Sequence, residues 1–148
     1  MAWVAVPYSN YQVPPSAPFP SGQTLARPML VIKLSCKSGN TFSCVAIVDS
    51  GADNCVFPAS FAGALGLDLL QMKSNLTGGV GSTANVTHFD TIEIDFGAGP
   101  FEVYAGFTAG MDLHGIGLLG QAGFFDRFDV MFSHKTGQFH INLPDPAP

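Results

Sequence analysis

A single carboxylate stands among very small residues where an apolar stretch of the sequence ends. Residues 43–48 (SCVAIV) form a continuous apolar run, and Asp49 follows it, itself followed by Ser50, Gly51 and Ala52. A carboxylate at this position is costly to bury unless hydrogen-bond donors surround it, and small neighbours leave room for the backbone and a substrate. Such a carboxylate could act in general acid–base catalysis. The same residues also fit an Asx turn that merely ends a strand, and the run by itself leaves both interpretations open.

A second segment of interest, residues 76–86, contains three closely spaced glycines. Gly78, Gly79 and Gly81 lie within four positions, with Val80 between the last two. This spacing favours a flexible hairpin tip between two strand arms in residues 76–86. A phosphate-binding loop is excluded because no Gly-Lys-Ser/Thr follows. A plain loose turn is the remaining alternative.

A third run formally matches a dinucleotide-binding fingerprint. Residues 115–120 read Gly-x-Gly-x-x-Gly and precede an expected helix. That function is excluded because no strand–helix–strand unit surrounds the motif and no acidic residue follows at the required interval. We interpret Leu118, Leu119 and Gly120 as the buried end of a strand that turns into a helix.

Neither the histidines nor the cysteines form a metal-binding pattern. The four histidines have no HExxH or i, i+4 spacing, and the three cysteines include no CxxC. Around Asp49 the alternating oxygen ligands of a calcium loop are missing, and Ser50 is outside any G-x-S-x-G elbow. The sequence therefore predicts no metal site and no cofactor. We expect the cysteines to be buried, reduced thiols.

Composition narrows the function classes further. Charged residues make up 11% of the 148 residues, less than half of the usual fraction of about 25%, and the net charge is −5. The six Lys and Arg residues form no cluster, which disfavours a nucleic-acid partner. The sequence shows neither a signal peptide nor an apolar run of membrane-spanning length, so we expect no membrane association and a cytoplasmic location.

Proline marks the ends of the folded region. Six of the eleven prolines lie within residues 1–28 and three within the last five residues. We predict a Pro-rich extended arm over 1–28, polyproline-like and without a core of its own. The folded domain is predicted over 29–143, with a tail over 144–148.

The elements that must position these residues are mostly strands. Apolar runs and alternation predict strands over 29–36, 43–48, 85–96, 101–107, 128–132 and 138–143. Pro58 favours the start of a short helix over 58–65, and a second helix is predicted over 122–128. No strand–helix alternation of βαβ type is present, so the predicted fold class is all-β.

Three of these motifs match one family in order and spacing, and the sequence resembles the retropepsin-like aspartic proteases, the single-lobe group that includes retroviral proteases and small bacterial members. The matching segments are Asp49-Ser50-Gly51-Ala52-Asp53 after an apolar strand, Gly78-Gly79-Val80-Gly81 as a flap tip, and Leu118-Leu119-Gly120 before a helix. With the flanking strands, the resemblance covers residues 29–143. It implies a closed β-barrel of the acid protease fold, with a glycine-rich flap hairpin and one or two short helices.

The resemblance implies peptide-bond hydrolysis, and that reaction requires two carboxylates. The ionised one activates water and the neutral one protonates the leaving nitrogen, because two like charges at close range share one proton. The chain contains one Asp-Ser-Gly and no second Asp-Ser/Thr-Gly. We therefore predict a C2 homodimer in which Asp49 of each protomer meets at the two-fold axis.

The resemblance also implies roles for the neighbouring residues. The catalytic set is Asp49, with Ser50 hydrogen-bonding across the axis and Gly51 presenting its carbonyl to the substrate backbone. The flap residues close over an extended polypeptide that binds as an added strand. The substrate-binding set is Ala52, Asp53, Asn54, Gly78, Gly79, Val80 and Leu118, with apolar pockets formed by Val56, Val80 and Leu118.

Two features depart from the retroviral pattern. Gln121 stands where retroviral enzymes carry Arg, so Asp53 lacks its usual partner unless Arg27 or Arg127 supplies one. The segment 1–28 has no counterpart in the minimal retroviral domain. The alternative to an aspartic endopeptidase is a homodimeric binding module of this fold without turnover, against which the intact Asp49 argues.

Overall fold

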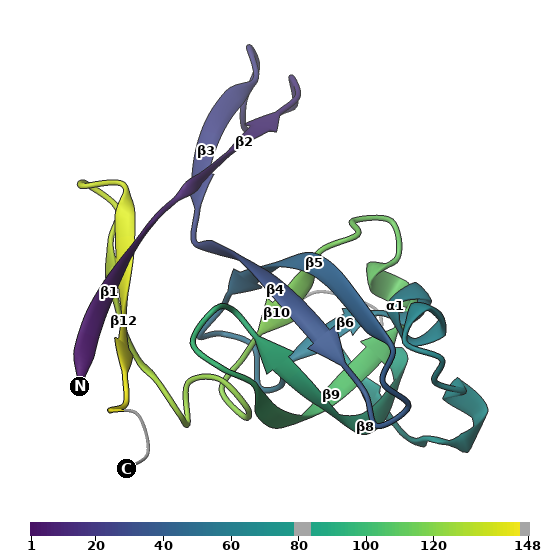
Figure 1. Cartoon of the computed structure of the whole chain (residues 1–148). Coiled ribbons are helices and arrows are strands. Elements are labelled where there is room, and N and C mark those ends of the chain that lie inside the picture. Colours follow the sequence, from purple (N-terminus) through teal and green to yellow (C-terminus); the bar gives the residue numbers. More distant parts are fainter. Residues whose placement is uncertain (79–83, 146–148) are drawn as a thin grey trace. The chain divides into compact units, whose positions relative to one another are not determined.

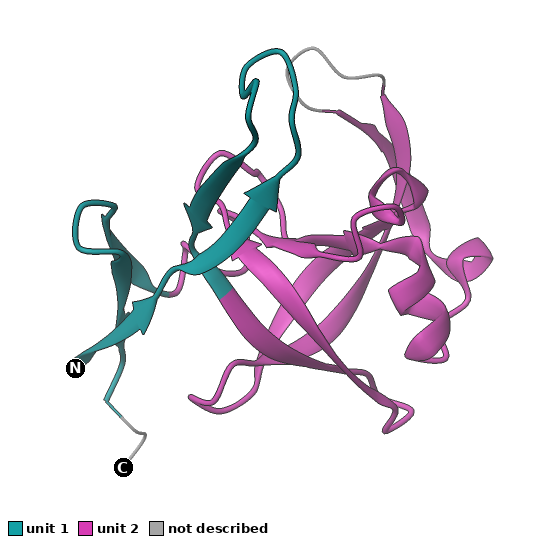
Figure 2. Cartoon of the chain, turned by 90° about the horizontal axis from the view of Figure 1, so that it is seen from above, with its two compact units in different colours: residues 1–29, 128–148 teal, residues 30–127 magenta. Residues whose placement is uncertain are grey.

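The computed structural model of the chain describes residues 1–78 and 84–145. Its contacts divide the chain into two units, coloured separately in Figure 2. Unit 1 is made of the two ends of the chain, residues 1–29 and 128–148, and unit 2 is residues 30–127. Each unit has its own sheet structure.

Among the described residues of unit 2, the main element is a seven-stranded sheet (Figure 1). In spatial order its strands are β4 (Met29–Ser35), β5 (Thr41–Val48), β10 (Gly117–Leu119), β6 (Val56–Pro58), β9 (Phe101–Thr108), β8 (Asn85–Asp95) and β7 (Lys73–Thr77). Strand β10 runs parallel to β5 and antiparallel to β6, which places two distant segments of the chain side by side. Strand β4 also pairs with β8, so the sheet curls back on itself.

Alternation of apolar and polar residues explains why this sheet has a packed inner face. In β4, Leu30, Ile32 and Leu34 are buried, whereas Val31 and Lys33 are exposed. Successive side chains of a strand point to opposite faces, so this pattern buries one face of β4. The buried apolar side chains of unit 2 are Leu30, Ile32, Leu34, Ala46, Val48, Cys55, Phe57, Phe61, Ala62, Leu65, Ile92, Ile94, Val103, Ala105, Phe107, Leu119 and Phe124.

One α-helix is present in the described part of the chain, α1 (Ala59–Ala64), directly after Pro58. Two short 3₁₀ helices, η1 (Leu69–Gln71) and η2 (Ala109–Met111), follow later in the chain. The second predicted helix, over 122–128, is wrong. Gly123 has a φ of +112°, which is incompatible with an α-helix; Ala122 instead forms an isolated bridge with Asn54, and residues 123–127 form turns.

Unit 1 contains paired strands within residues 1–28, where the proline content predicts a polyproline-like arm. A three-stranded antiparallel sheet has the order β1 (Ala2–Pro7), β12 (Gln138–Leu143) and β11 (Asp129–Ser133). A separate hairpin pairs β2 (Ser9–Val13) with β3 (Gln23–Arg27). Pro7 is the last residue of β1 and Pro14 follows the end of β2, positions where a missing N–H disturbs little of the ladder. The polyproline-like conformation expected for 1–28 is therefore replaced by paired strands over much of the segment.

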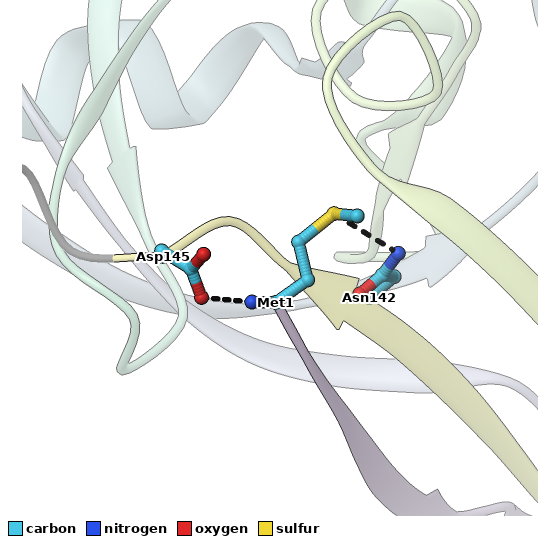
Figure 3. Close-up of polar contacts among 3 residues, drawn as sticks. All are labelled: Met1, Asn142 and Asp145. Atoms are coloured by element: carbon cyan, nitrogen blue, oxygen red, sulfur yellow. Dashed lines mark hydrogen bonds and ion pairs between the residues drawn. The ribbon is translucent and has the colours of Figure 1, made fainter.

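The two chain ends are also joined by side-chain contacts (Figure 3). The α-ammonium of Met1 forms an ion pair with Asp145, just beyond β12. The Asn142 amide contacts the Met1 sulfur at 3.6 Å. These contacts add to the six-residue register between β1 and β12.

The mostly β character predicted from the sequence is confirmed, with strands throughout both units and one short α-helix among the described residues. No described helix is long and apolar enough to cross a membrane. The closed barrel, the flap, the boundaries at 28 and 143 and the cytoplasmic location stay predictions.

Candidate active site

Asp49 lies at the end of a buried strand. It follows Val48, the last residue of β5, and its N–H donates to the carbonyl of Leu119 at 2.9 Å. Ala46 and Val48 are buried, while Asp49 itself is half-buried. The β5–β10 pairing thus fixes the backbone of Asp49 and leaves its carboxylate partly accessible to water.

The residues after Asp49 form a tight turn around its carboxylate. Oδ1 of Asp49 accepts the N–H of Gly51 at 2.9 Å, and the Asp49 carbonyl accepts the N–H of Ala52 at 3.2 Å. This is the Asx turn that the sequence offered as an alternative to a catalytic site. The two interpretations are compatible, because the turn hydrogen-bonds Oδ1 and holds the carboxylate in a defined orientation.

The loop after Asp49 is fastened to a second loop at residues 120–122. The N–H of Gln121 donates to the carbonyl of Ala52 at 2.8 Å, and the N–H of Ala122 donates to that of Asp53 at 2.9 Å. The side chain of Gln121 adds a third bond, from Nε2 to the carbonyl of Ser50 at 2.9 Å.

Gly120 makes this close approach of the two loops possible. A β-carbon there would lie 2.3 Å from the carbonyl oxygen of Asn54 and 2.6 Å from that of Ala52. Both distances are far below ordinary contact, so only glycine fits this position. The glycine of the Leu118-Leu119-Gly120 motif therefore allows the two loops to pack against each other.

A row of three apolar side chains lies beside Asp49. Leu118 of β10 is in register with Ile47 of β5 and with Val56 of β6. In-register neighbours share a face of the sheet, and all three are half-buried. Ile47 precedes Asp49 by two residues, so the row begins next to the end of β5 that carries Asp49. We refer to these three residues as the apolar row.

A shallow cavity of about 660 Å³ adjoins the turn, lined by Ser50, Asp53, Gln121, Ala122, Phe125 and Asp126. No cation forms an ion pair with Asp53 among the residues that the structure describes. Arg127, one of the two partners considered from the sequence, is occupied elsewhere. Its Nη2 donates to the Glu102 carbonyl at 2.9 Å and its guanidinium lies 5.4 Å from the centre of the Phe101 ring.

The cysteine nearest to the site is not suited to nucleophilic chemistry. Cys55 is buried, and its sulfur accepts the N–H of Gly120 at 3.4 Å. Burial raises its pKa to about 11, so the thiol stays protonated near neutral pH. The acidic side chains within residues 49–54 are those of Asp49 and Asp53.

The structure brings most of the predicted site residues together. Residues 49–54 form the turn and its continuation, and Leu118 lies beside them through the apolar row. Gly78 follows β7, one arm of the antiparallel β7–β8 hairpin. Gly79 and Val80 lie outside the described residues. Two features are not predicted from the sequence: Ile47, which its position two residues before Asp49 could have indicated, and the bond from Gln121 to Ser50, for which no local signal exists.

Comparison with known proteins supports the fold. No protein-family model and no curated protein matches the chain. In three dimensions it is similar to the crystal structure of a retropepsin-like aspartic protease from Rickettsia conorii, with a TM-score of 0.59 and 17% sequence identity. The superposition covers 95% of this chain and 98% of that one. At this identity the similarity establishes a retropepsin-like fold.

Proposed function

We propose that the chain is an aspartic endopeptidase that cleaves extended polypeptides and is active as a homodimer. The observation that carries this proposal is the half-buried Asp49 carboxylate, held by the Gly51 amide at the end of a buried strand in a retropepsin-like fold. The resemblance of the sequence motifs and the similarity of the fold are independent supports for it.

The proposed mechanism needs Asp49 of both protomers. An amide is a weak electrophile and its nitrogen a poor leaving group, so water must lose a proton and nitrogen must gain one. With two close carboxylates sharing one proton, the ionised carboxylate accepts the proton of the water and the neutral one protonates the nitrogen. Because each chain supplies one Asp-Ser-Gly, the pair forms only between two chains.

Ser50 and Gly51 are proposed to support this pair. The hydroxyl of Ser50 hydrogen-bonds across the dimer axis and holds the two turns together. The N–H of Gly51 orients the carboxylate of Asp49. The carbonyl of Gly51 accepts a hydrogen bond from the substrate backbone.

The substrate is proposed to bind in extended form, as an added strand. The apolar row offers a surface for an apolar side chain next to the scissile bond, and the resemblance adds Val80 to the residues of this pocket. Ala52, Asp53 and Asn54 contact the peptide further along, and Gly78 and Gly79 allow the hairpin to close over it. Preference for apolar residues flanking the cleaved bond follows.

Among the residues that the structure describes, the carboxylate of Asp53 forms no ion pair. Arg127, one of the two arginines considered from the sequence, instead contacts Glu102 and Phe101. Within unit 1 the Arg27 guanidinium lies 4.4 Å from the centre of the Tyr11 ring.

A cleavage assay tests the proposal. The purified chain is incubated with a denatured protein mixture across the acidic to neutral pH range, next to Asp49→Asn and in the presence of a statine-type inhibitor. We expect cleavage by the wild type alone, abolished by the inhibitor. Equal cleavage by Asp49→Asn contradicts the proposal. Dimers that bind the inhibitor but cleave nothing at any pH identify the binding module instead.

A further inference from the structure

One peptide group next to Asp49 is held from both of its ends. The peptide between Ser50 and Gly51 carries the carbonyl of Ser50 and the N–H of Gly51. The N–H donates to Oδ1 of Asp49 at 2.9 Å, and the carbonyl accepts the side-chain amide of Gln121 at 2.9 Å. A continuous chain of hydrogen bonds therefore runs from Gln121 through the peptide group to the carboxylate.

The backbone of Gln121 is itself fixed. Its N–H donates to Ala52 at 2.8 Å, and its carbonyl accepts the N–H of Asp126 at 3.0 Å. The preceding Gly120 admits the carbonyls of Ala52 and Asn54 at distances that exclude a side chain. The amide of Gln121 thus extends from an anchored point toward Ser50.

We propose that Gln121 is a positioning residue that fixes the orientation of the Ser50–Gly51 peptide and, through it, the carboxylate of Asp49. This role rests on the proposed function only in its consequence for catalysis, because the positioning itself is a property of the turn. Gln121 does not touch the substrate or the water in this account.

The physical reason lies in the freedom of Gly51. A peptide group that precedes glycine can rotate easily, since glycine tolerates backbone angles that other residues avoid. Rotation of this peptide would turn its N–H away from Asp49. A donor bound to the Ser50 carbonyl opposes that rotation, and it also polarises the peptide group and strengthens the N–H bond to the carboxylate.

A neutral donor suits this place. Asp49, Asp53 and Asp126 are the ionisable groups of the turn and of the cavity that Gln121 lines. A side-chain amide donates to the Ser50 carbonyl without adding charge to this acidic environment, and it does so at every pH.

The substitution Gln121→Glu converts the donor into one that depends on pH. A protonated carboxyl can donate to the Ser50 carbonyl, whereas a carboxylate can only accept and is repelled by it. The introduced carboxyl lies in the cavity that Asp53 and Asp126 also line, so its ionisation adds another negative charge there. Gln121→Met removes the donor at all pH values with little change of size. Gln71→Glu makes the same charge change on an exposed residue of η1 and serves as the control.

Two measurements on the full-length chain separate positioning from catalysis. The first follows the amide resonance of Gly51 by NMR as the pH is raised. We expect an additional titration step in Gln121→Glu, a displaced resonance at all pH values in Gln121→Met, and the wild-type curve in Gln71→Glu. The second is kcat/KM across the same range. The ratio of Gln121→Glu to wild type should fall about tenfold or more as the introduced carboxyl ionises, as expected for a hydrogen bond replaced by a repulsion.

The outcomes distinguish the two claims. Wild-type resonances of Gly51 in both Gln121 variants, or a kcat/KM ratio that does not change with pH, overturn the positioning role. A wild type that cleaves nothing refutes the proposed function, and the Gly51 resonance then decides the positioning role by itself.

Discussion

The substitution Gly120→Ala tests whether the approach of the two loops holds the Asp49 turn in place. An alanine β-carbon would lie 2.3 Å from the Asn54 carbonyl oxygen and 2.6 Å from that of Ala52. Both contacts are with backbone atoms, which cannot rotate away as a flexible side chain could. The two loops must therefore separate.

The cost can be worked from the contacts that separation disturbs. Overpacking at a tight site costs about 1–3 kcal/mol. Parting the loops also weakens the bonds from Gln121 to Ala52 and from Ala122 to Asp53, at about 1 kcal/mol each. The free energy of unfolding should therefore fall by about 3 kcal/mol or more.

The assay is urea denaturation of Gly120→Ala next to Gly63→Ala. Gly63 lies inside α1, and a β-carbon there meets no atom within 4 Å. The same chemical change should stabilise the chain at Gly63 by about 0.5–1 kcal/mol through helix propensity. A loss of less than about 1 kcal/mol for Gly120→Ala would refute the account of the two loops.

Three further predictions concern the pH dependence of stability, a surface contact and substrate preference. Burial raises the pKa of Cys44 to about 12 and that of Cys55 to about 11, so the unfolded chain loses these protons at a lower pH than the folded chain. The free energy of unfolding should therefore fall as the pH rises from about 9 toward 11, by about 1.4 kcal/mol per pH unit for each thiol. This fall should be smaller in a Cys44→Ala, Cys55→Ala double variant. Arg127→Met removes the donor to the Glu102 carbonyl and the cation over the Phe101 ring. The free energy of unfolding, measured by thermal denaturation, should fall by about 1 kcal/mol. An unchanged midpoint contradicts a stabilising role of these contacts. Leu118→Ser should lower kcat/KM about tenfold for peptides with large apolar residues beside the cleaved bond. The control Leu113→Ser changes a side chain that is 97% exposed and should leave kcat/KM unchanged. Equal effects of the two substitutions contradict the role of the apolar row.

Local patterns were sufficient to predict much of the main sheet. The alternation in 29–36 and 85–96 corresponds to β4 and β8, and the apolar run at 43–48 corresponds to the end of β5. These patterns are dictated by which face of a strand is buried, and that information is contained in neighbouring residues.

The failures have physical reasons of two kinds. A helix over 122–128 is predicted from the sequence because its aromatic residues lie three and four positions apart, but Gly123 adopts a positive φ that interrupts any helix there. The proline content predicts a polyproline-like arm where β1, β2 and β3 form, because Pro7 and Pro14 occupy or adjoin strand ends and leave the other residues free to pair.

The candidate site was predictable in its residue types and not in its connections. The carboxylate and its small neighbours are contiguous in the sequence, so the turn at Asp49 could be anticipated. The bond from Gln121 to Ser50 joins residues 71 positions apart and depends on the β5–β10 pairing, which no local pattern specifies.

The central claim is that each chain carries half of an active centre, and mixing wild-type and Asp49→Asn chains tests it most directly. The rate of peptide cleavage is measured at constant total protein while the fraction of Asp49→Asn is raised and the chains are allowed to exchange. Because a mixed pair has one carboxylate only, the rate per wild-type chain should fall in proportion to the wild-type fraction. A rate per wild-type chain that stays constant would show that a single chain cuts peptide bonds alone and would contradict the account.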